Sequence, residues 1–307
     1  MLENEERRTH TKDEQKAWKA ERKELELALE ALQQPLKEAC IPVMLVFEGW
    51  SAAGKGAVIA RTIARLDPRN YQVLTFGPAT DEEKRRPLLW PFWKGLPAKG
   101  QIAVLERSWF GRALERMEEE PKETARLVEE INIFERQLCD DGYLVLKFFL
   151  HIGQTEQRRR LEKLAGDDDT AWRVIDRDWR QNRDYVRRRE KLDLLLQATS
   201  TPHALWHVVW NEEKGSGPLE VLRTVKEALS DALAHGVPKP APAERAPWPL
   251  LEMPRLGQVD LSPRLSDADY DDALKKEKKR LSKLHSRLYR EKVPVVIGFE
   301  GWDAAGK

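Results

Sequence analysis

The sequence has few cysteines, no long apolar run and no large excess of charge of either sign. Its two cysteines, Cys40 and Cys139, do not have the spacing of a metal motif or a disulfide framework. No segment approaches the roughly 20 apolar residues that a membrane-spanning helix needs, and the charged first thirty residues are unlike a secretory signal. A formal net charge of +1 argues against a dedicated nucleic-acid-binding protein. We therefore expect a cytoplasmic protein that binds neither membrane nor nucleic acid.

Short apolar segments alternate with charged, helix-forming segments along most of the 307 residues. The apolar segments are expected to be buried strands, over 41–48, 71–76, 101–106, 143–152 and 204–210. The longest helices are expected over 2–38, 122–139 and 173–198. Strands that alternate with helices favour an α/β fold, with a parallel sheet covered on both faces.

One short phrase occurs twice in the chain. FEGWSAAGK occupies residues 47–55 and FEGWDAAGK occupies 299–307, so that Asp303 takes the place of Ser51. A charged helix and an apolar strand are predicted before each copy, the later strand over 293–300. This order predicts a duplication, with these parts along the chain: a first domain over 1–235, a proline-rich linker over 236–266, and over 267–307 the start of a second domain that is cut short.

The first copy has the pattern of a phosphate-binding loop. Gly49 to Lys55 fits G-x-x-x-x-G-K between a predicted strand and a predicted helix. Glycines let the backbone amides curl around phosphate oxygens, and the following helix adds its positive end. An ordinary glycine-rich turn is the alternative. The candidate phosphate- and nucleotide-binding residues are Gly49, Trp50, Ser51, Ala52, Ala53, Gly54, Lys55 and Gly56.

The loop lacks the hydroxyl that usually holds Mg²⁺ in P-loop enzymes, because Gly56 follows the lysine. Glu106 ends a predicted buried strand, where a metal-binding acid would lie. We predict Mg²⁺ as the cofactor, with Glu106 as a ligand, Ser51 as a weak ligand, and Asp303 as the ligand in the second copy. A strand end with a surface salt bridge is the alternative for Glu106.

Two groups of arginines accompany the loop. Arg107 and Arg112 follow Glu106 and could neutralise a transferring phosphoryl group, so that Lys55, Glu106, Arg107 and Arg112 are the candidate catalytic residues. Residues from about 154 to 190 are rich in arginine and aspartate, which is typical of a solvated helix face. Beside a phosphate loop, this region can instead form a lid that clamps a polyanion. Its candidate contacts are Arg158, Arg159, Arg173 and Arg177.

Together these motifs resemble the second polyphosphate kinase family, most of all its tandem-domain polyphosphate:AMP phosphotransferases. The resemblance rests on FEGW-x-AAGKG, on residues 80–112 (TDEEKRRPLLWPFWKGLPAKGQIAVLERSWFGR) and on 172–209, and it restarts near 267. It implies a P-loop kinase fold with a five-stranded parallel sheet and a helical lid. It also implies Mg²⁺-dependent transfer of a phosphoryl group from inorganic polyphosphate to AMP, giving ADP. Lys55 would then bridge the donor and acceptor phosphates, Arg107 and Arg112 would stabilise the transferring group, and the lid arginines would track the polyphosphate. We further expect a homo-oligomer.

Three departures from the family's pattern affect the expected activity. The family has Asp where this chain has Ser51 and Glu106, and it usually has Gly where Ala57 stands. A carboxylate misplaced by about 1 Å can cost on the order of 10²-fold in rate. We therefore expect a first domain of reduced activity. The alternatives are a non-catalytic domain that binds polyphosphate or nucleotide and organises dimers, and an ATP-dependent kinase, which the missing Ser or Thr after Lys55 disfavours.

Overall fold

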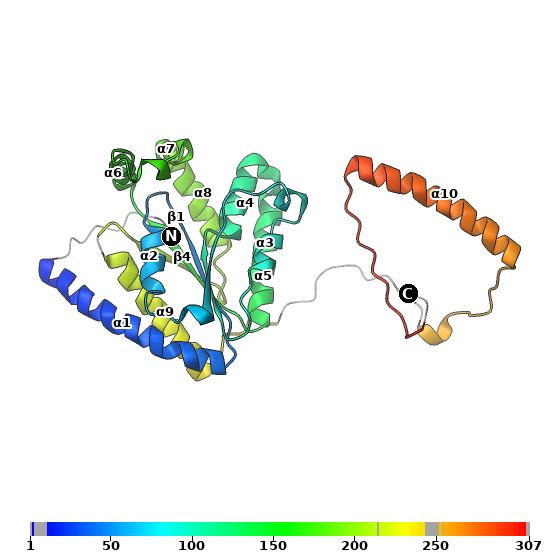
Figure 1. Cartoon of the computed structure of the whole chain (residues 1–307), viewed down its shortest axis with the longest axis horizontal. Helices are drawn as coiled ribbons and strands as arrows, with labels where there is room; N and C mark the ends of the chain where they lie inside the picture. The colour runs from blue at the N-terminus through cyan, green and yellow to red at the C-terminus, as the bar shows by residue number, and fades with distance from the viewer. Residues whose placement is uncertain (1, 3–10, 214, 243–251, 254, 305–307) are drawn as a thin grey trace. The chain divides into compact units, whose positions relative to one another are not determined.

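A parallel sheet of five strands organises the first of two units of the computed structural model, Met1–Glu244 (Figure 1). The model describes residue 2 and residues 11–213, 215–242, 252–253 and 255–304. The strands are β1 (Val43–Gly49), β2 (Tyr71–Thr75), β3 (Ile102–Glu106), β4 (Leu144–His151) and β5 (Trp206–Trp210). Their order is β2-β3-β1-β4-β5, and every neighbouring pair is parallel. The predicted α/β fold with a five-stranded parallel sheet is therefore confirmed.

Helices cover both faces of this sheet, which explains why β1 is apolar throughout. In Figure 1, α1, α2 and α9 lie on one side and α3, α4 and α5 on the other. Residues 43–48 of β1 are all buried, as expected for a central parallel strand. The bounds of these helices are α1 (Lys12–Glu38), α2 (Lys55–Thr62), α3 (Trp90–Lys94), α4 (Trp109–Glu119), α5 (Thr124–Asp140) and α9 (Ser216–His235). No helix within the described ranges is long and apolar enough to cross a membrane.

The strand order places a switch point between β1 and β3. The connection after β1 leads towards one edge of the sheet, whereas the connection after β3 leads towards the other. Sheets of this kind bind ligands outside the carboxyl ends of the two strands at such a point. The loop after Gly49 and the segment after Glu106 both begin there, so the fold brings the two predicted site motifs together.

The lid region is divided into more helices than predicted. The stretch 173–198 is helical as expected but is interrupted at Asp184: the chain forms α7 (Asp176–Arg183) and α8 (Tyr185–Ala198), after α6 (Gln154–Ala165) and a 3-10 turn at Ala171–Arg173. Asp and Asn residues compete for backbone hydrogen bonds and therefore favour helix ends. Asn182, in the last turn of α7, donates instead to Gln154 O and Gln157 Oε1, both at 2.9 Å. These contacts hold α7 against α6, and the backbone leaves helical geometry two residues later, at Asp184.

The second unit, Arg245–Lys307, contains one long helix among its described residues. This helix, α10 (Asp267–Glu291), is the charged helix that was predicted before the second copy of the phrase. The strand predicted over 293–300 was wrong, because these residues form no ladder and Val296 is 97% exposed. A strand needs a neighbour to satisfy its backbone groups, and the equivalent segment, β1, has one on each side. Parts of the predicted linker (243–251 and 254), and residues 3–10 of the first predicted helix, lie outside the described residues.

A buried ion pair crosses the core beside the sheet. Lys147 Nζ in β4 lies 2.5 Å from Glu135 Oε2 in α5, and both side chains are fully buried. Lys147 also donates to Thr199 O at 2.7 Å, and Glu135 Oε1 accepts from Trp109 Nε1 at 2.9 Å. Burial lowers the pKa of Lys147 and raises the pKa of Glu135, and each charge opposes the shift of the other. Because Trp109 is the first residue of α4, the pair fixes the start of that helix.

Candidate functional site

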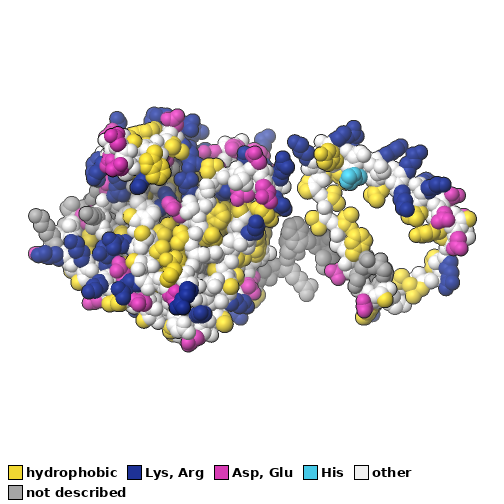
Figure 2. Space-filling model, viewed as in Figure 1, with side chains coloured by type: hydrophobic (Ala, Val, Ile, Leu, Met, Phe, Trp, Pro, Cys, Tyr) yellow, Lys and Arg dark blue, Asp and Glu magenta, His cyan; other side chains and the backbone are white. Residues whose placement is uncertain are grey.

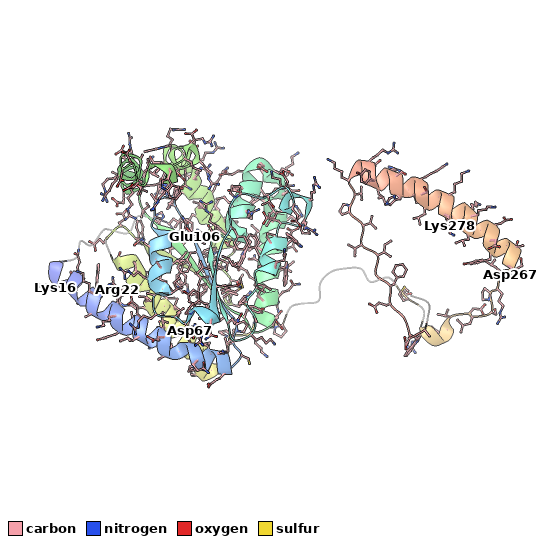
Figure 3. The ribbon with its side chains drawn as sticks, in the orientation of Figure 1. Lys16, Arg22, Asp67, Glu106, Asp267 and Lys278 are labelled. Atoms are coloured by element: carbon pink, nitrogen blue, oxygen red, sulfur yellow. The ribbon has the colours of Figure 1, made fainter. Side chains whose placement is uncertain are left out.

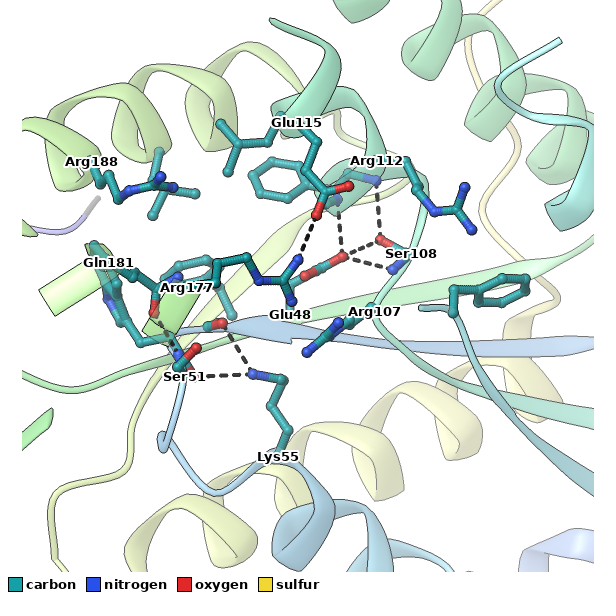
Figure 4. A pocket seen from close by; sticks show the side chains of 18 of the residues that line it. Glu48, Ser51, Lys55, Arg107, Ser108, Arg112, Glu115, Arg177, Gln181 and Arg188 are labelled. Atoms are coloured by element: carbon teal, nitrogen blue, oxygen red, sulfur yellow. Dashed lines mark hydrogen bonds and ion pairs between the residues drawn. The ribbon is translucent and has the colours of Figure 1, made fainter. Parts of the chain in front are cut away.

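A cavity of about 140 Å³ lies at the switch point, between the loop after β1 and the start of α4 (Figure 4). Its lining includes Ser51 and Lys55 from the loop, Arg107 and Arg112 from the segment after β3, and Arg177 from α7. Four of these five residues are cations. The arrangement gives a small, positively charged hollow that suits an anion.

The loop backbone has left-handed conformations that bend it around the cavity. Gly49 has φ +139° and Gly54 has φ +87°, and the latter is the N-cap of α2. Ala52 has φ +59°, which is uncommon for a residue with a Cβ atom. Since Lys55 and Gly56 begin α2, their amides have no partner within the helix. They can donate to an anion, as at other helix N-termini after glycine-rich loops.

Side chains from outside the loop hold its carbonyl groups. Three of them donate in register to three successive loop residues: Gln157 to Ser51 O (3.2 Å), Arg160 to Ala52 O (3.2 Å) and Asn211 to Ala53 O (2.7 Å). These donors come from α6 and from the end of β5. The prediction of a phosphate loop did not include them, and only their nearness in the fold identifies them.

The side chains of Lys55 and Arg107 contribute two positive charges to the cavity lining. Lys55 Nζ donates to Gly49 O at 3.1 Å and to Trp50 O at 3.0 Å. Burial lowers the pKa of Lys55, while the charges of Glu48, Glu106 and Asp178 raise it. Neither Lys55 nor Arg107 has an ion-pair partner within the described part of the chain. Both cations can therefore pair with a bound phosphate.

Three further arginines of the cavity are held by glutamates. The pairs are Arg112–Glu83 (3.1 Å), Arg177–Glu115 (2.9 Å) and Arg188–Glu118 (3.0 Å). The last two connect α7 and α8 to α4, and Figure 4 shows the pair between Arg177 and Glu115. Partly exposed ion pairs contribute only about 0–1 kcal/mol, so a phosphate can replace a glutamate as the partner at little cost. Arg112 and Arg177 were predicted site residues, whereas Arg188 belongs to the predicted arginine-rich region but was not among its candidate contacts.

Glu48 is a buried carboxylate of the site that the sequence reasoning also missed. Its Oε1 accepts from Ser108 N (2.7 Å), Ser108 Oγ (2.8 Å) and Gly111 N (3.1 Å). Burial raises the pKa of Glu48, whereas the bonds from Ser108 and the charge of Lys55 lower it. By binding the first turn of α4, Glu48 fixes the segment that carries Arg107 and Arg112. A charged residue at the end of an apolar strand was the signal that could have identified it.

The rim of the cavity is formed by Ser51 and α7. Ser51 Oγ donates to Asp178 Oδ1 at 2.6 Å, and Ser51 N donates to Gln181 Oε1 at 2.8 Å. Glu106 is not among the described residues that line the cavity; it is half-buried at the end of β3 (Figure 3). Mg²⁺ usually takes one or two carboxylates together with substrate phosphate oxygens. The carboxylate and hydroxyl of Asp178 and Ser51 fit that requirement, although no group of three or more His, Cys, Asp or Glu suited to a metal occurs among the described residues.

Three predicted lid contacts lie away from the cavity. Arg158 pairs with Glu162 and Arg159 with Glu156 along α6, while Arg173 lies 5.2 Å from the ring centre of Trp172. In Figure 2, Lys and Arg side chains alternate with Asp and Glu over α6 and α7. This surface matches the solvated helix face that the sequence left open as the alternative. Of the four predicted arginines, the structure brings only Arg177 to the site.

The second copy of the loop repeats one feature of the first. Ala304 has φ +60°, as Ala52 has φ +59°. Asp303 Oδ1 accepts from Ala304 N at 3.1 Å. Residues 305–307, including the lysine of the second copy, lie outside the described residues.

Trp50 packs in the protein core and is not exposed to solvent. It is fully buried, stacks on Tyr185 with ring centres 4.2 Å apart, and donates from Nε1 to His151 Nδ1 at 2.8 Å. Burial, together with the charge of Arg189, lowers the pKa of His151 to about 4. The neutral imidazole is therefore the form that the folded protein keeps near neutral pH.

This histidine makes stability depend on pH in a defined range. Its folded pKa of about 4 lies below the unfolded value near 6.5, so its contribution is complete above pH 6.5 and is lost as the pH falls towards 4. Between about pH 7.5 and pH 4.5, the wild type should lose about 2–3 kcal/mol more unfolding free energy than His151→Asn, whose amide oxygen can still accept from Trp50. Urea unfolding of both proteins across this range measures the difference. Parallel pH curves would contradict the assignment.

Comparisons with known proteins show which family the chain resembles. A family model described as Polyphosphate kinase 2 (PPK2) matches residues 11–235 and 264–307. Polyphosphate:AMP phosphotransferases of Pseudomonas aeruginosa and Pseudomonas syringae are 33% and 31% identical over 288 and 296 residues; each match covers 92% of this chain and 58% or 59% of the relative. The crystal structure of Polyphosphate Kinase 2 from Arthrobacter aurescens TC1 matches with a TM-score of 0.68 and 25% identity, covering 81% of this chain and 86% of that one. The chain thus spans less than two thirds of the length of these two phosphotransferases.

Proposed function

The chain belongs to the polyphosphate kinase 2 family, and on that premise we propose that it transfers the terminal phosphoryl group of inorganic polyphosphate to AMP, giving ADP. The observation that carries this proposal is that Lys55 and Arg107 line one cavity beside the loop, where neither cation has an ion-pair partner among the described residues. The names of the related phosphotransferases support polyphosphate as donor and AMP as acceptor.

The residues of the site have distinct roles in this reaction. A phosphate oxygen of AMP attacks the terminal phosphorus of polyphosphate, the bridging P–O bond breaks, and the shortened chain leaves as an anion. The loop amides and Lys55 bind the phosphates on both sides of the transferring group, and Arg107 and Arg112 stabilise its charge. Mg²⁺, when bound, neutralises further phosphate charge, and Ser51 and Asp178 would hold it. Glu106 stays a predicted ligand that could act from the end of β3.

A non-catalytic role in binding polyphosphate is the second candidate. It is favoured by the rim, where Gln181 and Asp178 already occupy the amide and hydroxyl of Ser51. Such a domain would retain the phosphate chain through Lys55 and deliver it to an active partner domain.

We further propose that residues 1–235 and the segment from 267 onwards are two copies of one domain in a cytoplasmic homo-oligomer. The repeated phrase and the matching backbone of Ala52 and Ala304 support the duplication. So does the family model, which resumes at residue 264.

Formation of ADP tests the catalytic proposal. Wild type, Lys55→Ala and the control Lys16→Ala, which changes an exposed lysine of α1, are incubated with AMP, Mg²⁺ and polyphosphate or ATP, and nucleotides are separated by chromatography. We expect polyphosphate-driven ADP formation by the wild type and the control, and a loss of at least about 10²-fold in Lys55→Ala. Lys55-dependent binding without turnover would instead support the non-catalytic candidate. Faster transfer from ATP than from polyphosphate would overturn both.

A further inference from the structure

We infer that Asp178 of helix α7 supplies, from outside the loop, the carboxylate that the first phosphate loop lacks at position 51. Its ligand would be the magnesium complex of a polyphosphate, so the inference rests on the proposed function. It adds a metal-binding role to a residue that neither the loop motif nor the strand-end motif contains.

The geometry fixes Asp178 beside Ser51, a residue of the cavity lining. Its Oδ1 accepts from Ser51 Oγ at 2.6 Å, and its Oδ2 accepts from Ile175 N at 3.0 Å. The residue is only 8% exposed. Its hydrogen-bond partner Ser51 lines the cavity, as do its helix neighbours Arg177 and Gln181, although Asp178 itself is not among the described lining residues. Asp178 is therefore a positioned carboxylate beside the loop and not a mobile surface group.

A carboxylate beside a phosphate-binding loop favours phosphate binding only if a cation lies between the two. It repels phosphate oxygens unless a positive charge lies between them. Mg²⁺ meets this need because it commonly joins one or two carboxylates to substrate phosphates. The neighbouring hydroxyl of Ser51 offers a second oxygen, so that the two side chains together present a carboxylate and a hydroxyl to one ion.

The two copies of the phrase differ in where a carboxylate is available to the loop. In the second copy, Asp303 takes the position of Ser51, so that loop carries its own carboxylate. In the first copy, an aspartate at position 51 would lie at hydrogen-bond distance from Asp178, where two like charges disfavour each other. In the first copy the loop thus carries the hydroxyl of Ser51 and the lid carries the carboxylate of Asp178, whereas in the second copy the loop itself carries a carboxylate.

Moving the carboxylate from position 178 to position 51 tests this assignment. Sodium tripolyphosphate is titrated calorimetrically, in Mg²⁺ and in EDTA, into the full chain as wild type, Asp178→Asn, Ser51→Asp/Asp178→Ser and Lys55→Ala. Asparagine can keep both contacts of Asp178, since its amide oxygen accepts from Ile175 N and its NH₂ donates to Ser51 Oγ. We expect Asp178→Asn to bind at least about tenfold more weakly than wild type in Mg²⁺, but equally or more tightly in EDTA. The double variant should regain the Mg²⁺ dependence.

The outcomes separate this inference from the proposed function. If the wild type fails to bind tripolyphosphate, or if Lys55→Ala binds it equally well, the proposed function is wrong. If binding needs Lys55 but Asp178→Asn keeps the wild-type response to Mg²⁺, the inference alone is wrong. Equal weakening of Asp178→Asn in both buffers, without recovery in the double variant, would show that Asp178 only stabilises the lid and would also overturn the inference.

Discussion

Replacing Lys147 with methionine is expected to lower the free energy of unfolding by about 3–5 kcal/mol. The change leaves the Glu135 carboxylate in the core, fully buried and without its cation. It also removes the donor to Thr199 O. Urea unfolding monitored by circular dichroism near neutral pH measures the loss.

A matched double variant distinguishes the unpaired charge from the loss of packing. Glu135→Gln/Lys147→Met has no buried charge, and its glutamine oxygen can still accept from Trp109 Nε1. It should recover at least about half of the lost stability. In the single variant, burial raises the folded pKa of Glu135 above its unfolded value, so stability should increase as the pH falls through that folded pKa. A double variant as unstable as the single one, with no such pH response, would contradict an ionic origin.

Gly49→Ala is expected to destabilise the first unit by about 3 kcal/mol or more and to abolish phosphate binding. A Cβ atom at this position would lie 2.3 Å from Leu150 O and 2.8 Å from Leu150 N. These are backbone atoms of the neighbouring strand, so they cannot move aside as a flexible side chain does. The φ of +139° adds conformational strain for any residue other than glycine.

Gly56→Ala is the control for this change. An added Cβ atom at Gly56 meets nothing within 4 Å, and the residue lies within the first turn of α2. Alanine there should leave stability unchanged or raise it by about 0.5–1 kcal/mol. Thermal unfolding of both variants measures the contrast. Similar melting temperatures for Gly49→Ala and wild type would show that the loop does not need this close approach to β4.

The sequence was sufficient for the sheet and for the centre of the site. Buried parallel strands appear as short apolar runs, and the G-x-x-x-x-G-K spacing locates the loop between a strand and a helix. The ends of β1 and β3 then bring Lys55, Arg107 and Arg112 together, because the carboxyl ends of parallel strands meet at one edge. These inferences need only local patterns and one rule of topology.

The remaining features depend on contacts between distant segments. Asp178 and Asn211 lie more than a hundred residues from the loop that they contact, and no local pattern relates them to it. The break between α7 and α8 at Asp184 lies beside Asn182, which binds α6, and helix periodicity alone does not reveal such a contact. The segment 293–300 has the composition of β1 but no neighbouring strand among the described residues, which shows that composition alone does not make a strand.

Binding of tripolyphosphate to the wild type and to Lys55→Ala, measured by calorimetry in Mg²⁺, tests most directly whether the cavity after β1 receives a chain of phosphates. We expect saturable binding to the wild type and, in the variant, a loss of at least about tenfold in affinity, because a charge-assisted contact to phosphate is removed. Equal affinities, or no binding to either protein, would contradict this expectation.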